Sequence, residues 1–227
     1  MLSNKQNSIS ADISISLKNA NEALAEIERF VAEINDDYID VEAWQIFHVW
    51  LDARPQYSSC YFSLFRAWQF FNWKPVPGTI PLPLDQNCRT IAESFLKIKG
   101  HLVPTEQLKI IKSGMDQNID LFEIQSFSGD TMLVSGLLSK TKLSIYAPGF
   151  IKKGRAKDFI VAHAIPFDLY NYIFLGTSQF ISRDAKPLVD EFAQFLRNYP
   201  FVKNSFDSLQ SDFFNLFYDL QQYSIKS

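Results

Sequence analysis

The spacing of apolar residues changes along this chain near residue 119, from a helical period to the shorter alternation typical of β-strands. Before that point apolar residues recur every three or four positions, as one face of an α-helix requires. After it, short runs rich in β-branched and aromatic residues are separated by turn residues such as Gly129-Asp130. Helical and strand-forming segments are therefore separated along the chain, which predicts an α+β fold.

The N-terminal part is predicted to be a helical bundle. Asp40 is placed to cap a helix over Val41–Ala53, because a carboxylate accepts the free amide hydrogens at a helix start. Further helices are predicted over about 56–73, 87–99 and 105–116, and a proline-rich surface loop over 74–85. The first helix, over about 12–35, is predicted from an apolar stripe with spacings of four and three, formed by Ile13, Leu17, Ala20, Leu24, Ile27, Val31 and Ile34.

The second half of the chain is predicted to form a small β module followed by two helices. The expected strands cover about 119–127, 131–138, 141–147, 158–166 and 170–177. Short strands joined by tight turns predict a five-stranded antiparallel barrel or a strongly curled sheet. Two C-terminal helices, about 184–198 and 205–222, are expected to pack on the rest. We expect a helical domain over 1–117, the β module over 118–182 and the C-terminal helices over 183–227.

Composition excludes several classes of protein. With 47% hydrophobic and 15% aromatic residues and only eight glycines, the chain is neither disordered nor collagen-like. Cys60 and Cys88 lie far apart and match no zinc-binding spacing, so no metal or cofactor is expected. The N-terminus is polar and no run of about 18 apolar residues occurs. These features predict a cytoplasmic protein that does not contact membranes.

From the helix that contains Arg66–Trp73 to Ser178, the chain resembles a poorly characterised bacterial family, some members of which end in a SEC-C zinc motif. In that family a helical region rich in Trp and Phe precedes a small β module. The resemblance implies this fold but no established activity, and the cysteine-rich tail is absent here, so it implies no zinc. This chain departs from the family's pattern at Gly136-Leu137, Ser139-Lys140 and His163. The matching stretches are Leu121–Ile124, Gly129, Val134–Leu138, Ile151–Gly154, Val161–Pro166 and Tyr172–Gly176.

One literal catalytic motif occurs, the DDxxD of Asp36, Asp37 and Asp40. In isoprenoid synthases this spacing binds Mg²⁺ and diphosphate, and Asn204, Ser208 and Asp212 match the companion metal site. The synthase fold is wholly helical, however, whereas about 60 residues here are predicted as strands. The aspartates also stand where a helix begins, which favours a capping role. A Mg²⁺-dependent enzyme is therefore the third hypothesis.

The basic residues of the β module suggest a polyanion-binding loop. Although the net charge is −3, residues 1–52 carry 3 basic and 10 acidic residues, so the remaining 175 residues have a net charge of +4. A window over 140–157 contains six basic residues and no acid. Such a cluster could bind phosphates of a nucleic acid, which is the alternative function that we consider. Its members are Lys140, Lys142, Lys152, Lys153, Arg155 and Lys157.

Aromatic residues are concentrated in the helices over 44–73, which hold all four tryptophans. The helix over 56–73 is apolar on two faces, so its second face must be covered by the core, a ligand or a partner. The leading hypothesis is a non-enzymatic interaction or adaptor protein that binds a protein partner or forms a homo-oligomer. The candidate interface combines this helix with the heptad stripe, at Leu17, Leu24, Ile27, Val31, Phe62, Phe70 and Trp73.

The histidines and glycines give no sign of catalysis. His48, His101 and His163 lie on different predicted elements and lack a local metal-binding spacing. The sequence contains no GxSxG, HExxH, GxGxxG or Walker loop. These patterns identify no catalytic residue, so any catalytic residues stay unknown, and we favour a protein that is not an enzyme.

Overall fold

The computed structural model describes residues 2–34, 37–49, 58–74, 90–148, 154–167 and 171–198, together with Leu220 and Tyr223. The helices of this part of the chain are α1 (Leu2–Glu33), α2 (Asp37–Val49), α3 (Ser58–Phe71), α4 (Ile91–Lys99), α5 (Thr105–Met115) and α6 (Lys186–Asn198). The strands are β1 (Ile119–Ser128), β2 (Thr131–Gly136), β3 (Lys142–Tyr146), β4 (Phe159–Pro166) and β5 (Asn171–Ile181). Short 3₁₀ turns follow α4 (Gly100–Leu102) and precede α6 (Arg183–Ala185).

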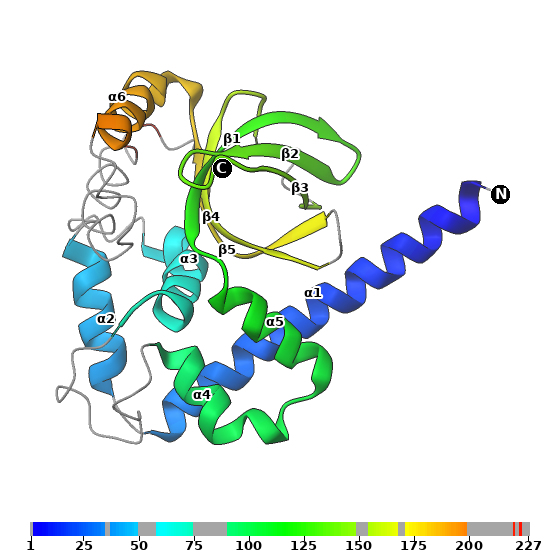
Figure 1. Cartoon of the computed structure of the whole chain (residues 1–227), viewed down its shortest axis with the longest axis vertical. Coiled ribbons are helices and arrows are strands. Elements are labelled where there is room, and N and C mark those ends of the chain that lie inside the picture. The colour runs from blue at the N-terminus through cyan, green and yellow to red at the C-terminus, as the bar shows by residue number, and fades with distance from the viewer. Residues whose placement is uncertain are drawn as a thin grey trace.

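The predicted α+β class is confirmed, with a helical N-terminal part, a five-stranded barrel and a C-terminal helix (Figure 1). The periodicity located the barrel strands to within a few residues, because alternation and turn residues bound each strand. The predicted loop at 74–85 and the predicted helix at 205–222 lie largely outside the described residues. In that last region Leu220 is buried, and the Tyr223 carbonyl accepts a hydrogen bond from the Ser182 amide at 2.9 Å.

The strands close into a barrel in the order β1-β2-β3-β5-β4. Four of the neighbouring pairs are antiparallel, whereas β3 and β5 are parallel through Ser144–Asn171 and Ile145–Tyr172. The prediction of a wholly antiparallel barrel was therefore wrong. Strand directions must alternate around an antiparallel ring, and an odd number of strands cannot alternate all the way round. One parallel pair is the smallest departure that closes five strands.

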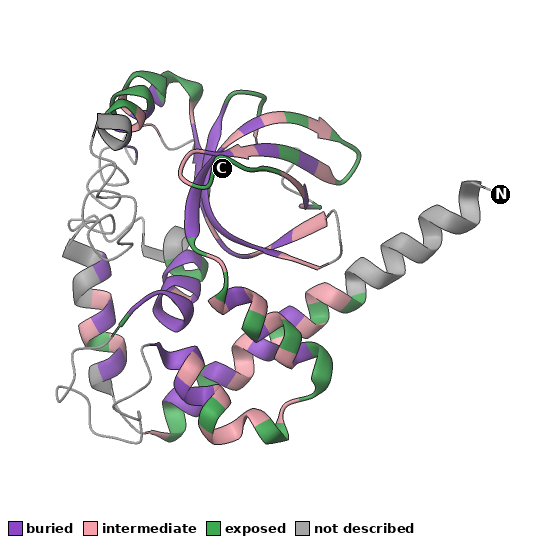
Figure 2. Cartoon of the chain, viewed as in Figure 1, coloured by how far each residue is buried: buried purple, intermediate pink, exposed green. Residues whose placement is uncertain are grey.

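The interior of the barrel is filled by side chains that alternate along each strand. On β2, Met132 and Val134 are buried while Leu133 between them is exposed. Figure 2 shows the same alternation of buried and exposed residues along the strands that face away from the helices. The buried cluster inside the barrel consists of Phe122, Ile124, Met132, Val134, Ile145, Ala147, Ile160, Ala162, Ala164 and Phe180.

Strand β4 is buried on both faces because the helices cover its outer side. Seven of its eight residues are buried, and α3 and α5 both pack on it. Helix α3 also lies along β5, where the Ser63 hydroxyl donates to the Thr177 carbonyl at 3.2 Å and accepts from the Thr177 amide at 3.3 Å. A second and larger core cluster contains residues of α1 to α5, β1, β4, β5 and α6. The barrel and the helical part therefore share one core.

Candidate functional site

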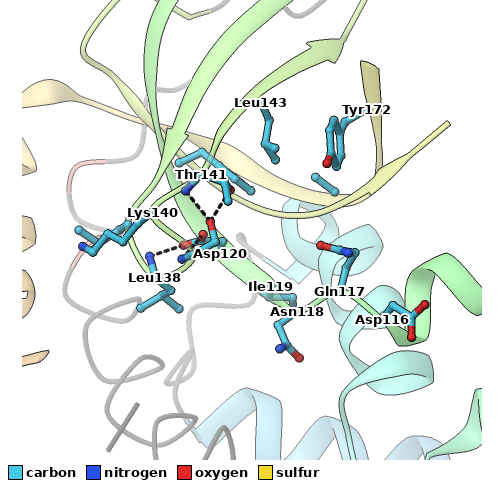
Figure 3. A pocket seen from close by; sticks show the side chains of 14 residues that line it. Asp116, Gln117, Asn118, Ile119, Asp120, Leu138, Lys140, Thr141, Leu143 and Tyr172 are labelled. Atoms are coloured by element: carbon cyan, nitrogen blue, oxygen red, sulfur yellow. Dashed lines mark hydrogen bonds between the residues drawn. The ribbon is translucent and has the colours of Figure 1, made fainter. Parts of the chain in front are cut away.

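A cavity of about 610 Å³ opens at one end of the barrel. Two segments and several single strand residues form its walls. The segments are residues 116–120 at the junction of α5 and β1 and the turn Leu137–Thr141. The single strand residues are Phe122, Leu143, Ala164 and Tyr172, which give the cavity apolar surface. Figure 3 shows Leu143 and Tyr172 near each other in this group. Cavities of this size hold small organic ligands, and barrel mouths are a common place for them.

Asp120 fixes the wall of this cavity. Its side chain is buried, and it accepts hydrogen bonds from the amides of Leu121 (2.7 Å), Leu138 (2.8 Å) and Ser139 (2.9 Å). Burial raises the pKa of this carboxyl above 3.8, and the hydrogen bonds from Ser139, Leu138 and Leu121 oppose that rise. A Cβ at Gly136 would overlap the Asp120 carboxylate, so a glycine is needed where the β2–β3 turn approaches Asp120. Asp120 thus holds the β2–β3 turn against β1.

We expect Asp120→Ala to lower the free energy of unfolding by about 1–3 kcal/mol, because three amides lose their acceptor. Urea denaturation of the two proteins would measure this change. Asp130→Ala is the matched control, because it removes an exposed carboxylate from another turn of the barrel, between β1 and β2, and leaves Asp120 and its amide donors in place. An Asp120→Ala protein as stable as the wild type would show that the carboxylate does not hold the turn.

The predicted basic window is only partly gathered into one site. Lys140 is exposed at the β2–β3 turn with a φ of 58° and lines the cavity, while Lys142 is exposed on β3. Arg155 is exposed before β4, and Lys157 forms an ion pair with Glu123 at 3.1 Å. Lys152 and Lys153 lie outside the described residues. An acidic residue from a distant part of the sequence therefore neutralises one of the six expected cations.

Strand pairing brings Lys142 and Lys157 to the same side of the barrel. Lys142 pairs with Ser135, and Ser135 in turn pairs with Glu123, the partner of Lys157. Neighbouring strands lie about 4.8 Å apart, so the backbones of Lys142 and Glu123 are separated by about 10 Å. Met132, Val134 and Leu143 pack inside, so alternation places Lys142 on the outer face. We call the outer residues of β2 and β3 the β2–β3 face, which comprises Thr131, Leu133, Ser135, Lys142, Ser144 and Tyr146.

Most of the predicted interface residues are buried inside this chain. Ile27, Val31, Phe70 and Trp73 belong to the large core cluster, and Leu17 and Leu24 pack against it partly buried. Four of the seven candidates therefore have almost no surface left for a partner. The second apolar face of α3 is covered by the chain's own helices and strands. Of the candidates, only Phe62 is exposed, at 48%.

The DDxxD motif is not assembled as a metal site in the described residues. Asp36 lies outside them, and the described residues contain no group of three His, Cys, Asp or Glu that could hold a metal ion. Asp40 does not cap a helix at Val41, because α2 already begins at Asp37. Its carboxylate instead accepts hydrogen bonds from Arg66 Nη1 and Gln69 Nε2, both at 2.8 Å. The capping prediction for Asp40 was wrong, because α3 supplies a cation that sequence proximity cannot reveal.

His163 belongs to the junction between the helices and the barrel. It is fully buried on β4, its Nε2 donates to the Gly114 carbonyl of α5 at 3.0 Å, and its ring meets Phe71 of α3 edge-on. Burial lowers its pKa from 6.5 to about 4, and the bond to Gly114 opposes this shift. His163 is therefore a neutral core residue at pH 7. His101 is exposed, and the side chain of His48 lies outside the described part.

Sequence reasoning missed the cavity and the residues that form it. Asp120 could have been noticed, because it is an acidic residue between Ile119 and Leu121 in an otherwise apolar strand. Gln117 and Tyr172 carry no such signal, since polar and aromatic residues are ordinary at strand ends. Strands far apart in the sequence meet only when the barrel closes. The cavity is therefore a property of the tertiary structure.

The barrel and its cavity define the class of this protein as a helix-supported five-stranded barrel with an open mouth. No family model, curated protein or solved structure matches this chain. Within the described residues, none of the helices combines the length and apolar character that crossing a bilayer requires.

Proposed function

We propose that this protein binds single-stranded nucleic acid across the β2–β3 face. The observation that carries the proposal is the topology of the barrel, closed in the order β1-β2-β3-β5-β4 with its main helix contacts on β4 and β5. Figure 1 shows β2 and β3 on the side away from α3. This arrangement resembles the OB-fold, a five-stranded Greek-key barrel whose strands 2 and 3 bind oligonucleotides and oligosaccharides.

The chemistry of the β2–β3 face supports a polyanionic ligand. Lys142 is exposed on this face, and Arg155 is exposed in the segment that precedes β4. Lys157 forms an ion pair with Glu123, which lies two strands from Lys142. Cations spaced along such a surface bind successive phosphates and release their counterions.

Two features favour a charged strand over an uncharged oligosaccharide. Lys142 and Arg155 are exposed cations of the β module, and residues 53–227 carry the chain's positive excess. An oligosaccharide would need hydroxyl and amide partners but no cations. We therefore expect binding of nucleic acid that weakens steeply as the salt concentration rises. Salt-independent binding of a neutral sugar would contradict the proposal.

The proposal is tested by titrating fluorescent single-stranded DNA and RNA at low and moderate salt. We expect Lys142→Glu combined with Arg155→Glu to weaken binding at least about tenfold at low salt and to flatten the salt dependence. Lys109→Glu combined with Lys112→Glu is the matched control, because it makes the same change in net charge at two exposed lysines of α5. The proposal fails if micromolar protein binds neither strand, or if Lys142→Glu/Arg155→Glu binds as well as the control.

A further inference from the structure

The β2–β3 turn connects the mouth of the cavity to the β2–β3 face. Lys140 and Thr141 line the cavity, and Lys142, the next residue, is exposed on that face. A strand whose phosphates contact Lys142 would therefore pass the opening. The volume of about 610 Å³ is far larger than one water molecule needs, and it lies in the range of cavities that bind small organic ligands.

The walls of the cavity suit a planar, polar heterocycle. Phe122, Leu143 and Ala164 provide apolar surface, and Tyr172 adds an aromatic ring on the same side as Leu143 (Figure 3). Gln117 lies across the cavity from these two residues, and its side-chain amide can both donate and accept hydrogen bonds. A flat ring with polar edges would contact the apolar walls with its faces and Gln117 with its edge.

The charged residues that line the cavity would orient a bound ligand. Lys140 and Asp116 stand at opposite sides of it in Figure 3. A phosphate is attracted to Lys140 and repelled by Asp116, whereas ring N–H groups are attracted to the Asp116 carboxylate. Asp120 is already occupied, because its oxygens accept three amide hydrogens. Its part is to hold the turn that carries Lys140.

We propose that this cavity binds the base of a nucleotide, with the phosphate at Lys140 and the polar edge of the base toward Gln117 and Asp116. The inference rests on the proposed function, because the ligand is one unstacked nucleotide of a bound strand. A free nucleoside monophosphate offers the same base and phosphate. Free mononucleotides and oligonucleotides are therefore tested in separate arms.

The test is isothermal titration calorimetry of the whole chain with the four ribonucleoside monophosphates, the matching nucleosides and inorganic phosphate. We expect at least one monophosphate to bind. Ala164→Leu, which fills the cavity, and Tyr172→Leu, which removes the ring, should each weaken that binding at least about tenfold. Lys140→Met should weaken the monophosphate and leave the nucleoside unchanged. Leu102→Ala, at an exposed leucine in the turn after α4, is the matched control and should bind normally.

Thermal melts establish which variants are folded, and Tyr172→Leu decides the question if Ala164→Leu does not fold. The inference is overturned if folded cavity variants bind mononucleotides as the control does, or if no mononucleotide binds. Oligonucleotide binding that is lost in Lys142→Glu/Arg155→Glu but unaffected by the cavity variants would retain the proposed function and reject the cavity. Mononucleotide binding that depends on the cavity, without any oligonucleotide binding, would retain the cavity as a nucleotide site and reject the proposed function.

Discussion

Replacing Gly176 by alanine is expected to lower the free energy of unfolding by about 3 kcal/mol, at the upper end of what overpacking costs. A Cβ at this position on β5 would overlap the backbone carbonyl of Ser63 and come within 2.8 Å of the Ala67 Cβ, both on α3. Backbone atoms cannot rotate out of the way as the end of a long side chain can. Helix α3 would have to move away from β5 and open the core that both elements share.

Urea denaturation followed by tryptophan fluorescence measures this effect, because Trp68 is fully buried on α3. Gly100→Ala is the matched control. Gly100 has a right-handed φ of −56°, and a Cβ there would have Leu96 Cδ2 as its nearest neighbour at 3.7 Å, an ordinary contact. That substitution should change stability by less than about 1 kcal/mol. Equal denaturation midpoints for Gly176→Ala and the wild type would contradict the close packing of α3 on β5.

Acidification is expected to destabilise the protein through His163. The folded chain holds the pKa of His163 at about 4, whereas the unfolded chain has the ordinary value of 6.5. Between these values the unfolded state binds the proton and the folded state does not, so stability falls as the pH falls from 6.5 to 4. Each pH unit corresponds to about 1.4 kcal/mol, which gives a loss of about 3 kcal/mol across the window.

The measurement is the free energy of unfolding of the wild type and of His163→Gln at several pH values between 7 and 4. Glutamine does not titrate and can still donate a hydrogen bond to the Gly114 carbonyl. The difference between the two proteins isolates His163 from other groups, including Asp120, whose raised pKa acts in the opposite direction. The stability of the variant relative to the wild type should rise as the pH falls. A constant difference would show that His163 is charged in the folded state or is not buried.

These two predictions concern one place in the molecule. Gly176 pairs with His163 across β5 and β4, and His163 reaches Gly114 on α5. A Cβ at Gly114 would come within 2.6 Å of the Phe71 ring, so two glycines allow the helices to approach the barrel closely. The mouth of the barrel begins where α5 leads into β1, at residues 116–120. The packing of this junction therefore also positions one wall of the candidate site.

The sequence by itself determined where the elements lie and to which class the fold belongs. Alternation with period two located the barrel strands, since each strand has one face in the interior. The helical period predicted α1 with its buried Ile27 and Val31, although it could not say whether this chain or a partner buries them. The sequence did not reveal that β3 and β5 are parallel, because five predicted strands could equally have formed an open curled sheet.

Only the tertiary structure decided which distant residues meet. Asp40 binds Arg66, Glu123 pairs with Lys157, and the amides of the β2–β3 turn converge on Asp120. The physical reason is that periodicity records which face of an element is apolar, but not which other element covers that face. Charge partners and cavity walls arise from that choice. The apolar stripe of α1 and the alternation of the strands could thus be predicted from the sequence. The barrel mouth forms only when the five strands close into a barrel.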